Sequence, residues 1–279
     1  MVKDIVVHLD GSAEDETRLS YAELLATGQG AHVTGLYTNV MPDIAMMATP
    51  EAAAAAATVF TELEQAATIQ GDATAARLLA RLTRSGLPVE LARCDRRIAE
   101  LSQAATSAAR AADLFITTCP YRGGDGPNWD GLAEAVLSDS GRGTLFVPPG
   151  MPARGPVQRI LVAWRDTHDA ARAVAEALPF VATSTRIDLV MVDADQNEGG
   201  APAADIAKHL TRHGGKVDVK AVASDGRSIA QVLIDEAGRG AIDLLVMGGY
   251  GHSRLREWVL GGTTRDILTA TTIPVLMAH

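Results

Sequence analysis

Two pairs of glycines near the C-terminus have the residue types and spacing to form a phosphate-binding loop. Gly248 and Gly251 directly follow a short apolar run, and Gly261–Gly262 come after nine further residues, immediately before a helical pattern. Glycine lets backbone N–H groups approach a ligand without an intervening Cβ, and a helix N-terminus has unpaired N–H donors that favour phosphate. The spacing therefore predicts a backbone cradle for a phosphate chain, to which the hydroxyls of Thr263 and Thr264 could add.

The elements that would position this loop occur twice in the chain. The stretches "DIVVHLDGS" at 4–12 and "RILVAWRDT" at 159–167 are both short apolar strands that end in a polar turn and a helix start. In each half, further helices and strands then alternate until a fifth strand is reached. This alternation is typical of parallel sheets covered by helices. We therefore expect an α/β fold of two tandem, Rossmann-like domains, each with a five-stranded parallel sheet.

The segment Pro148–Pro156, "PPGMPARGP", has no hydrophobic periodicity and is rich in Pro and Gly, so it is the expected linker between domains at 1–149 and 157–279. In the second domain, Thr167 is expected to cap the first helix. In the first domain Ser12 is the expected cap, with Asp15 as its capping-box partner.

The first half is longer than the second. Ile5 matches Ile160 and Leu137 matches Leu268, so 24 more residues lie between these points in the first half. They fall between its second and third strands, and predict a helical insertion at about 41–72. Three methionines there, Met41, Met46 and Met47, could cover a pocket or a partner, although a longer helix with a soft apolar packing face is the favoured interpretation.

The glycines of the predicted phosphate-binding loop follow a fourth strand, and their spacing there resembles the motif of the universal stress protein (UspA) family. The chain resembles a tandem form of that family, with two such domains in one chain. The resemblance covers nearly all 279 residues and is carried by Gly248, Gly251, Gly261 and the ending "GGTTRDIL…TTIPVLMA". It implies a five-stranded α/β fold of the adenine nucleotide alpha hydrolase type, and many members bind ATP with this motif. The family has Ser or Thr after the third glycine. Gly262 stands there in this chain, so the resemblance implies backbone contacts to phosphate but one side-chain contact fewer.

The resemblance also places the end of each first strand near the base and ribose, where the family favours a turn like Asp-Gly-Ser. The first half has Asp10, Gly11 and Ser12 there, whereas the second half has Arg165 after Trp164. The Trp164 ring could stack on a base, block it, or be a core residue. The nucleotide-binding set implied for the second domain is Ala163, Trp164, Arg165, Val192, Gly248, Gly251, His252, Gly261, Gly262, Thr263 and Thr264.

The corresponding loop of the first half departs from this pattern. Thr118 aligns with Gly248, Tyr121 with Gly251, and Asp130 with Gly261. A carboxylate at the phosphate position repels phosphate, and the added side chains fill the space that a backbone cradle needs. We therefore expect one phosphate site in each chain, in the second half.

Composition excludes several other classes of function. The formal net charge of -9 argues against a broad nucleic-acid-binding face. Cys94 and Cys119 are expected to be free thiols, no apolar run approaches ~18 residues, and no secretory signal is recognised, so a cytoplasmic protein is expected. No catalytic motif is present, and no catalytic or metal-binding residues are predicted. The stripe of Asp205, His209 and His213 is interpreted as a solvated helix face rather than a metal site.

The sequence thus predicts a stress-response protein that binds ATP, or alternatively AMP or ADP, in its second domain as a regulatory ligand. Mg²⁺ could accompany ATP. The alternatives are a nucleotide-free module that binds a protein or an apolar ligand, and, less favoured because no residue is an evident base, a slow ATPase. The last strands of the two halves, within 143–149 and 273–278, are expected to pair inside the chain as a pseudo-dimer. Other faces remain free for a homodimer or for an unknown protein partner.

Overall fold

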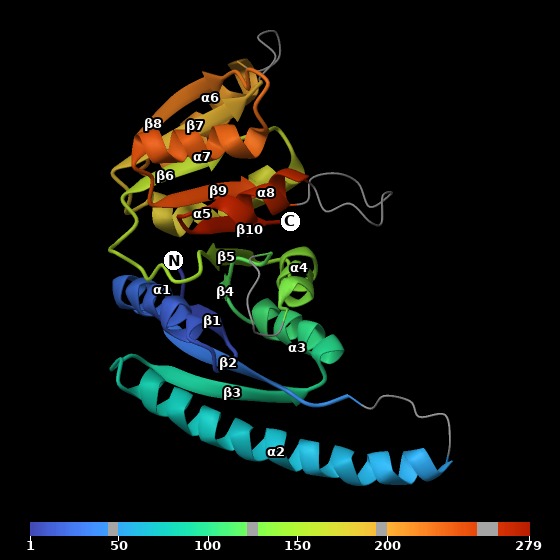
Figure 1. Cartoon of the computed structure of the whole chain (residues 1–279). Coiled ribbons are helices and arrows are strands. Elements are labelled where there is room, and N and C mark those ends of the chain that lie inside the picture. Colours follow the sequence, from blue (N-terminus) through green and yellow to red (C-terminus); the bar gives the residue numbers. More distant parts are fainter. Residues whose placement is uncertain (44–49, 122–127, 194–199, 250–261) are drawn as a thin grey trace.

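The structure, a computed structural model, describes residues 1–43, 50–121, 128–193, 200–249 and 262–279 (Figure 1). The elements of the first half are β1 (Asp4–Leu9), α1 (Glu14–Gln29), β2 (His32–Val40), α2 (Pro50–Thr83), β3 (Val89–Arg96), α3 (Ile98–Arg110), β4 (Leu114–Thr118), α4 (Asp130–Asp139) and β5 (Gly143–Val147). Those of the second half are β6 (Arg159–Ala163), α5 (His168–Val181), β7 (Arg186–Val192), α6 (Gly200–Arg212), β8 (Val217–Val222), α7 (Ile229–Gly240), β9 (Leu244–Gly248), α8 (Gly262–Ala270) and β10 (Val275–Ala278).

All described strands belong to one ten-stranded sheet in the order β3-β2-β1-β4-β5-β10-β9-β6-β7-β8. Strands within each half are parallel, whereas β5 and β10 are antiparallel, with Leu145 paired to Leu276 and Phe146 to Val275. The α/β class is therefore confirmed, and so is the pairing of the two last strands inside the chain. This pairing joins the two expected five-stranded sheets into one.

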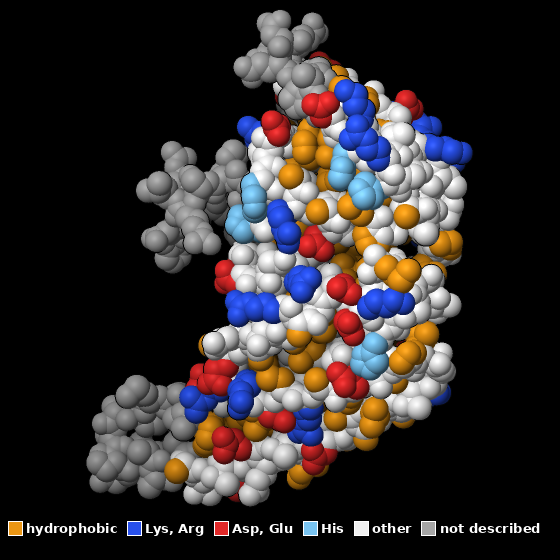
Figure 2. All heavy atoms as spheres, turned by 180° about the vertical axis from the view of Figure 1, so that it is seen from behind, with side chains coloured by type: hydrophobic (Ala, Val, Ile, Leu, Met, Phe, Trp, Pro, Cys, Tyr) orange, Lys and Arg blue, Asp and Glu red, His pale blue; other side chains and the backbone are white. Residues whose placement is uncertain are grey.

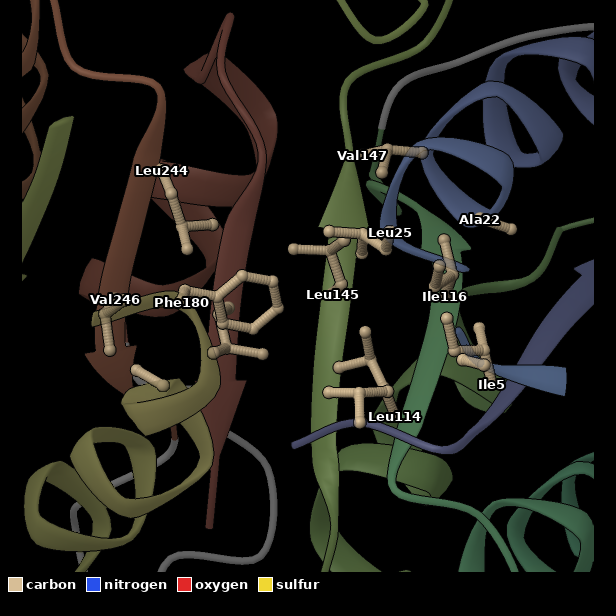
Figure 3. Packing of buried hydrophobic residues seen from close by; sticks show 14 of the residues in the cluster. Ile5, Ala22, Leu25, Leu114, Ile116, Leu145, Val147, Phe180, Leu244 and Val246 are labelled. Atoms are coloured by element: carbon tan, nitrogen blue, oxygen red, sulfur yellow. The ribbon is translucent and has the colours of Figure 1, made fainter. Parts of the chain in front are cut away.

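Helices cover both faces of this sheet. Alternate strand residues point to opposite faces. Ile160 and Val162 pack in one apolar cluster with α1, α2, α5 and α6, while Leu161 packs in another cluster with α4, α7 and α8. Figure 3 shows the first cluster on both sides of the β5–β10 junction, with Phe180 of α5 on one side and Leu145 of β5 on the other. Since the two halves share a sheet and a core, the domain limits 1–149 and 157–279 stay a prediction.

The extra length of the first half lies in one helix. Helix α2 has 34 residues, whereas its counterpart α6 has 13. It packs on β2 and β3 with the face that carries the buried Leu78 and Leu82, and it continues past the end of β3 (Figure 1). Met46 and Met47 lie outside the described residues, and Met41 contacts Asn39. Within the described ranges, no helix has both the length and the apolar character needed to cross a membrane.

Candidate functional site

The strand ends predicted for the second-half site lie at one edge of the sheet. Ala163 is the last residue of β6, Val192 of β7 and Gly248 of β9. Ala163 is in register with Val190 of β7 and with Met247 of β9, so the three carboxyl ends are neighbours. In open α/β sheets ligands bind beyond this edge. Arg165, just past β6, is exposed.

Trp164 lies directly after β6 and is partly a core residue. Its ring packs against the larger apolar cluster, and its backbone N–H donates to the Val190 carbonyl at 2.8 Å. The indole Nε1 is buried and has no hydrogen-bond partner in the described part of the chain. A buried N–H without a partner is costly, so this atom is available to a hydrogen-bond acceptor that enters the site.

Packing within the protein requires a glycine at position 248, whether or not a ligand binds beside it. A Cβ at this position would lie 2.7 Å from the backbone nitrogen of Ala170 and 2.8 Å from the carbonyl carbon of Asp169. Both atoms belong to the first turn of α5, whose start is fixed by Thr167, which accepts a hydrogen bond from the Ala170 N–H as predicted. The prediction explained this glycine by access to phosphate alone. The structure adds the close approach of α5 to the end of β9.

The start of α8 is open. Gly262 is exposed, and a Cβ there would meet nothing within 4 Å. Thr263 is half-buried and Thr264 is buried, so Thr263 has more surface to offer a ligand. No acidic residue stands in the first turn of α8. The other predicted cradle residues, Gly251, His252 and Gly261, lie outside the described residues.

At the equivalent edge of the first half, side chains of the protein fill the turn after β1. Arg18 is 1% exposed and pairs with Asp10 at 2.6 Å and with Asp15 at 2.7 Å. Trp129, just before α4, donates its indole N–H to the other oxygen of Asp10 at 2.7 Å. Asp10 also accepts hydrogen bonds from the backbone and side chain of Ser12. The aspartate of the Asp-Gly-Ser turn is therefore held by internal partners.

Asp15 does not act as the predicted capping-box partner of Ser12. Its carboxylate accepts the backbone N–H groups of Asp10 and Gly11, at 3.0 and 2.9 Å. Ser12 accepts from the Glu14 N–H at 3.3 Å, and the cap position is Ala13, without a side-chain cap. The physical reason is the buried Arg18 guanidinium, which draws both aspartates into the turn.

Asp10, Asp15 and Arg18 form a buried ion network at neutral pH. Although burial alone would raise it, the Arg18 guanidinium holds the pKa of Asp10 well below its usual range. Burial, with the nearby Asp10 carboxylate, raises the pKa of Asp15 to about 6. Both groups are therefore carboxylates at pH 7, and Arg18 is shared between them.

His8 completes the cluster and is buried. Arg18 donates to its Nδ1 at 3.2 Å, so Nε2 carries the proton and donates to Thr38 at 2.9 Å. The Trp129 ring meets the imidazole edge-on, with centroids 4.8 Å apart. Burial and the Arg18 charge lower the pKa of His8 to about 3. The imidazole is therefore neutral in the folded protein.

The neutral His8 gives a testable pH dependence. Below about pH 6.5 the unfolded chain protonates this histidine while the folded protein does not, so acidification favours unfolding. Asp15, whose pKa is raised, has the opposite effect, because its protonation in the folded protein stabilises the fold as the pH falls. A comparison of the wild type with His8→Gln cancels this contribution and isolates that of the histidine. The free energy of unfolding of the wild type, minus that of the variant, should fall by about 1–3 kcal/mol between pH 7 and pH 4. Urea unfolding at both pH values measures this, and a constant difference would contradict a neutral buried His8.

A carboxylate also occupies the start of α4. Asp130, the first residue of this helix, accepts the backbone N–H of Tyr121 at 3.0 Å. Tyr121 adopts a positive φ of 69° and donates its hydroxyl to Glu134 at 2.7 Å. A carboxylate in the first turn interacts favourably with the helix dipole. The first half thus places its own anion where the second half has the glycines before α8.

Sequence reasoning identified Asp10 and Asp130 but missed Arg18, Asp15 and Trp129 as parts of this filled site. An arginine three residues after an aspartate on one helix is a common surface pair, so the sequence gave no sign that this pair is buried. Trp129 stands 119 residues from Asp10 along the chain.

A separate cavity of about 490 Å³ lies between the two halves. It is lined by Tyr121 from the first half and by residues of the α7 and α8 region, among them Gln231, Ile234 and Arg265. The Arg265 guanidinium lies over the Tyr121 ring, 5.1 Å from its centroid. None of the described residues predicted for the nucleotide is among those that line this cavity.

Two further expectations from the sequence concern metal binding and the two cysteines. The His209 and His213 rings meet edge-on at 4.7 Å, while Asp205 pairs with Lys208. Among the described residues, no group of three or more His, Cys, Asp or Glu side chains could hold a metal ion. Neither Cys94 nor Cys119 forms a disulfide with a described residue.

Comparisons with known proteins agree with this geometry. A model described as the Universal stress protein family matches residues 156–279. The second half of the chain is therefore similar to the universal stress protein family. A curated relative, universal stress protein Slr1230 of Synechocystis sp., is 61% identical over 36 residues, and this match spans only 13% of the chain and 12% of that protein.

Two solved structures share the fold over the whole chain. A universal stress protein from Archaeoglobus fulgidus DSM 4304 has a TM-score of 0.74 at 13% identity, with 99% of this chain and 97% of that chain covered. A putative universal stress protein from Pseudomonas aeruginosa UCBPP-PA14 has a TM-score of 0.61 at 14% identity, covering 99% and 92%. At these identities the likeness shows the fold alone, and this fold extends over both halves.

Proposed function

We propose that this protein binds ATP, or the related ADP or AMP, in the universal stress protein domain of its second half. One observation carries the proposal: the two halves differ at the start of the helix that follows their fourth strand. In the first half Asp130 supplies a carboxylate there. In the second half α8 starts at the exposed Gly262, with open space around it and no acid in its first turn. A helix start of this kind attracts phosphate.

The rest of the second-half edge is compatible with a nucleotide. The carboxyl ends of β6, β7 and β9 meet beside Trp164, whose buried indole N–H has no partner within the described ranges. The remainder of the ligand would lie along these strand ends, in the position that open α/β sheets use for ligands. The described residues offer no metal-binding group, so Mg²⁺ would arrive with ATP.

We further propose that the nucleotide regulates a cytoplasmic stress-response protein and is not turned over rapidly. The sequence contains none of the usual motifs that position a catalytic base for hydrolysis. In the same proposal the first half is a second universal stress protein domain whose nucleotide site is filled by its own Trp129 and Asp130.

Matched substitutions in the two halves test the site. Gly262→Asp would place a carboxylate at the start of α8, where a Cβ meets nothing and where an acid suits the helix dipole. It should weaken ATP binding by about 10- to 100-fold through charge repulsion while leaving the fold intact. Gly131→Asp, in the first turn of α4, also has open space and is the control that should leave ATP binding unchanged.

Isothermal titration calorimetry with ATP measures both variants. Equal affinity of wild type and Gly262→Asp would contradict a phosphate site at α8, and a loss of binding in Gly131→Asp would place the site in the first half. Absence of heat and of a thermal shift for the wild type at millimolar ATP would instead favour the nucleotide-free alternative.

A further inference from the structure

Helix α2 carries an exposed apolar stripe. Val59, Leu63 and Ile69 are 54%, 52% and 69% exposed, and the stripe continues through exposed alanines at 66, 73, 76 and 80. The steps of three and four residues keep these side chains on one side of the helix. Large apolar side chains at this exposure on one helix are typical of an interaction surface.

No described element covers this stripe. The opposite side of α2, with Leu78 and Leu82, packs on β2 and β3, and Figure 1 shows no element on the side of α2 that faces away from β3. Figure 2 views the molecule from behind and shows exposed hydrophobic side chains over its lowest part, where α2 lies.

The stripe is asymmetric in side-chain size along its length. Within the stripe, the larger side chains Val59, Leu63 and Ile69 lie in the N-terminal part and only alanines lie in the C-terminal part. Leu79 is also 47% exposed, but it is rotated by about 100° around the helix from Ala80 and lies on the flank of the stripe. If two copies of α2 lie antiparallel around a two-fold axis between residues 69 and 70, each larger side chain faces a small one. The level pairs are Val59 with Ala80, Leu63 with Ala76, Ala66 with Ala73, and Ile69 with Gln70. A parallel pair would place large beside large and leave space between alanines.

Charges along the stripe side of α2 also differ between its two ends. Glu62 is exposed in the N-terminal part and Arg77 in the C-terminal part, while the exposed Asp72 is paired with Arg93 of β3. The antiparallel arrangement brings Glu62 level with Arg77 of the other copy, and it also opposes the two helix dipoles. One nitrogen of Arg77 donates to the Gly11 carbonyl at 2.9 Å, which fixes the side chain and leaves further donors. A parallel pair would instead bring like charges level with one another.

We propose that two copies of this chain associate through antiparallel α2 helices. In the antiparallel arrangement, large side chains of one copy face small side chains of the other, and Glu62 faces Arg77. The surface is therefore complementary to a second copy of the same chain. The shorter α6 of the second half, with 13 residues, has no equivalent stripe length. The proposal is independent of nucleotide binding.

Sedimentation velocity tests the association. The wild type should be dimeric at micromolar concentration, and Ile69→Glu should weaken the dimer by about 100-fold, because two charges would meet at the axis. Ile229→Glu is the matched control: it replaces an isoleucine that is 41% exposed at the first position of α7, and should leave the dimer unchanged. A monomeric wild type, or a dimer unaffected by Ile69→Glu, would overturn the proposal.

Cysteine cross-linking tests the direction of the pair. In a Cys94→Ser background, oxidation of a mixture of Val59→Cys and Ala80→Cys chains should give cross-linked dimers, whereas either variant alone should not. Ile69→Cys, next to the axis, should cross-link to its own copy. Efficient self-cross-linking of Val59→Cys would show a parallel pair and overturn the antiparallel arrangement.

Discussion

Replacement of Arg18 by Met is expected to lower the free energy of unfolding by about 3–5 kcal/mol, the range for removing one partner of a buried ion pair. The side chain is 1% exposed and neutralises two aspartates, Asp10 and Asp15, at 2.6 and 2.7 Å. Without it, both carboxylates stay buried with hydrogen bonds but no positive partner. Methionine replaces most of the lost volume, so the effect reports the charge rather than a cavity.

Urea unfolding at pH 7 measures this effect, with Arg172→Met as the control. Arg172 pairs with Glu176 on α5 at 3.0 Å, but its side chain is 38% exposed, and exposed pairs contribute only about 0–1 kcal/mol. Addition of Asp15→Asn to Arg18→Met should restore part of the loss, because it removes one of the unpaired charges. A cost below about 1 kcal/mol for Arg18→Met would contradict the buried network.

Replacement of Gly248 by Ala is expected to cost about 3 kcal/mol, the upper end of the usual range for overpacking. The new Cβ would meet backbone atoms of Ala170 and Asp169 at 2.7 and 2.8 Å. A flexible side chain could turn away, but the backbone of a helix start can move only together with the helix. Thermal or urea unfolding measures the loss.

Gly262→Ala is the matched control for this glycine. It lies in the same predicted cradle, yet its surroundings are open, so alanine should be neutral or stabilise α8 by about 0.5–1 kcal/mol. If Gly248→Ala proved as stable as the wild type, the close approach of α5 to β9 would be wrong. Gly248 would then be explained by ligand access alone.

The fold could be predicted from the sequence because its signals are local and repeated. Each apolar strand ends in a turn that starts a helix, and the order recurs in both halves. The same repetition predicted that "GTLFVPP" and "IPVLMA" would pair, which β5 and β10 confirm. The position of the extra length was also readable, since α2 is the one long helix between β2 and β3.

The site could be predicted only in part, because several of its contacts join distant segments. The hydrogen bond from Trp129 to Asp10 connects residues 119 positions apart, and no periodic pattern reports such a contact. The role of Asp15 depends on the burial of Arg18, which local spacing does not reveal. Gly248, expected just past the strand, is the last residue of β9, and its packing reason required the position of α5.

The two halves of the chain use the same positions of the fold differently. The first half uses its Asp-Gly-Ser turn and its helix start for contacts within the protein, with His8, Arg18 and Trp129 between them. The second half keeps an open helix start and a Trp164 indole N–H without a described partner. A shared sheet and core then hold the filled first half beside the half for which we propose nucleotide binding.

The most direct test of this account is the stoichiometry of ATP binding to the full chain, measured by calorimetry with the concentration of folded protein known. One ATP per chain is the predicted result, because among the described residues only the second half has an open helix start at the proposed phosphate position. Two per chain would show that Trp129 and Asp130 do not close the first half, and none would contradict a nucleotide site at α8.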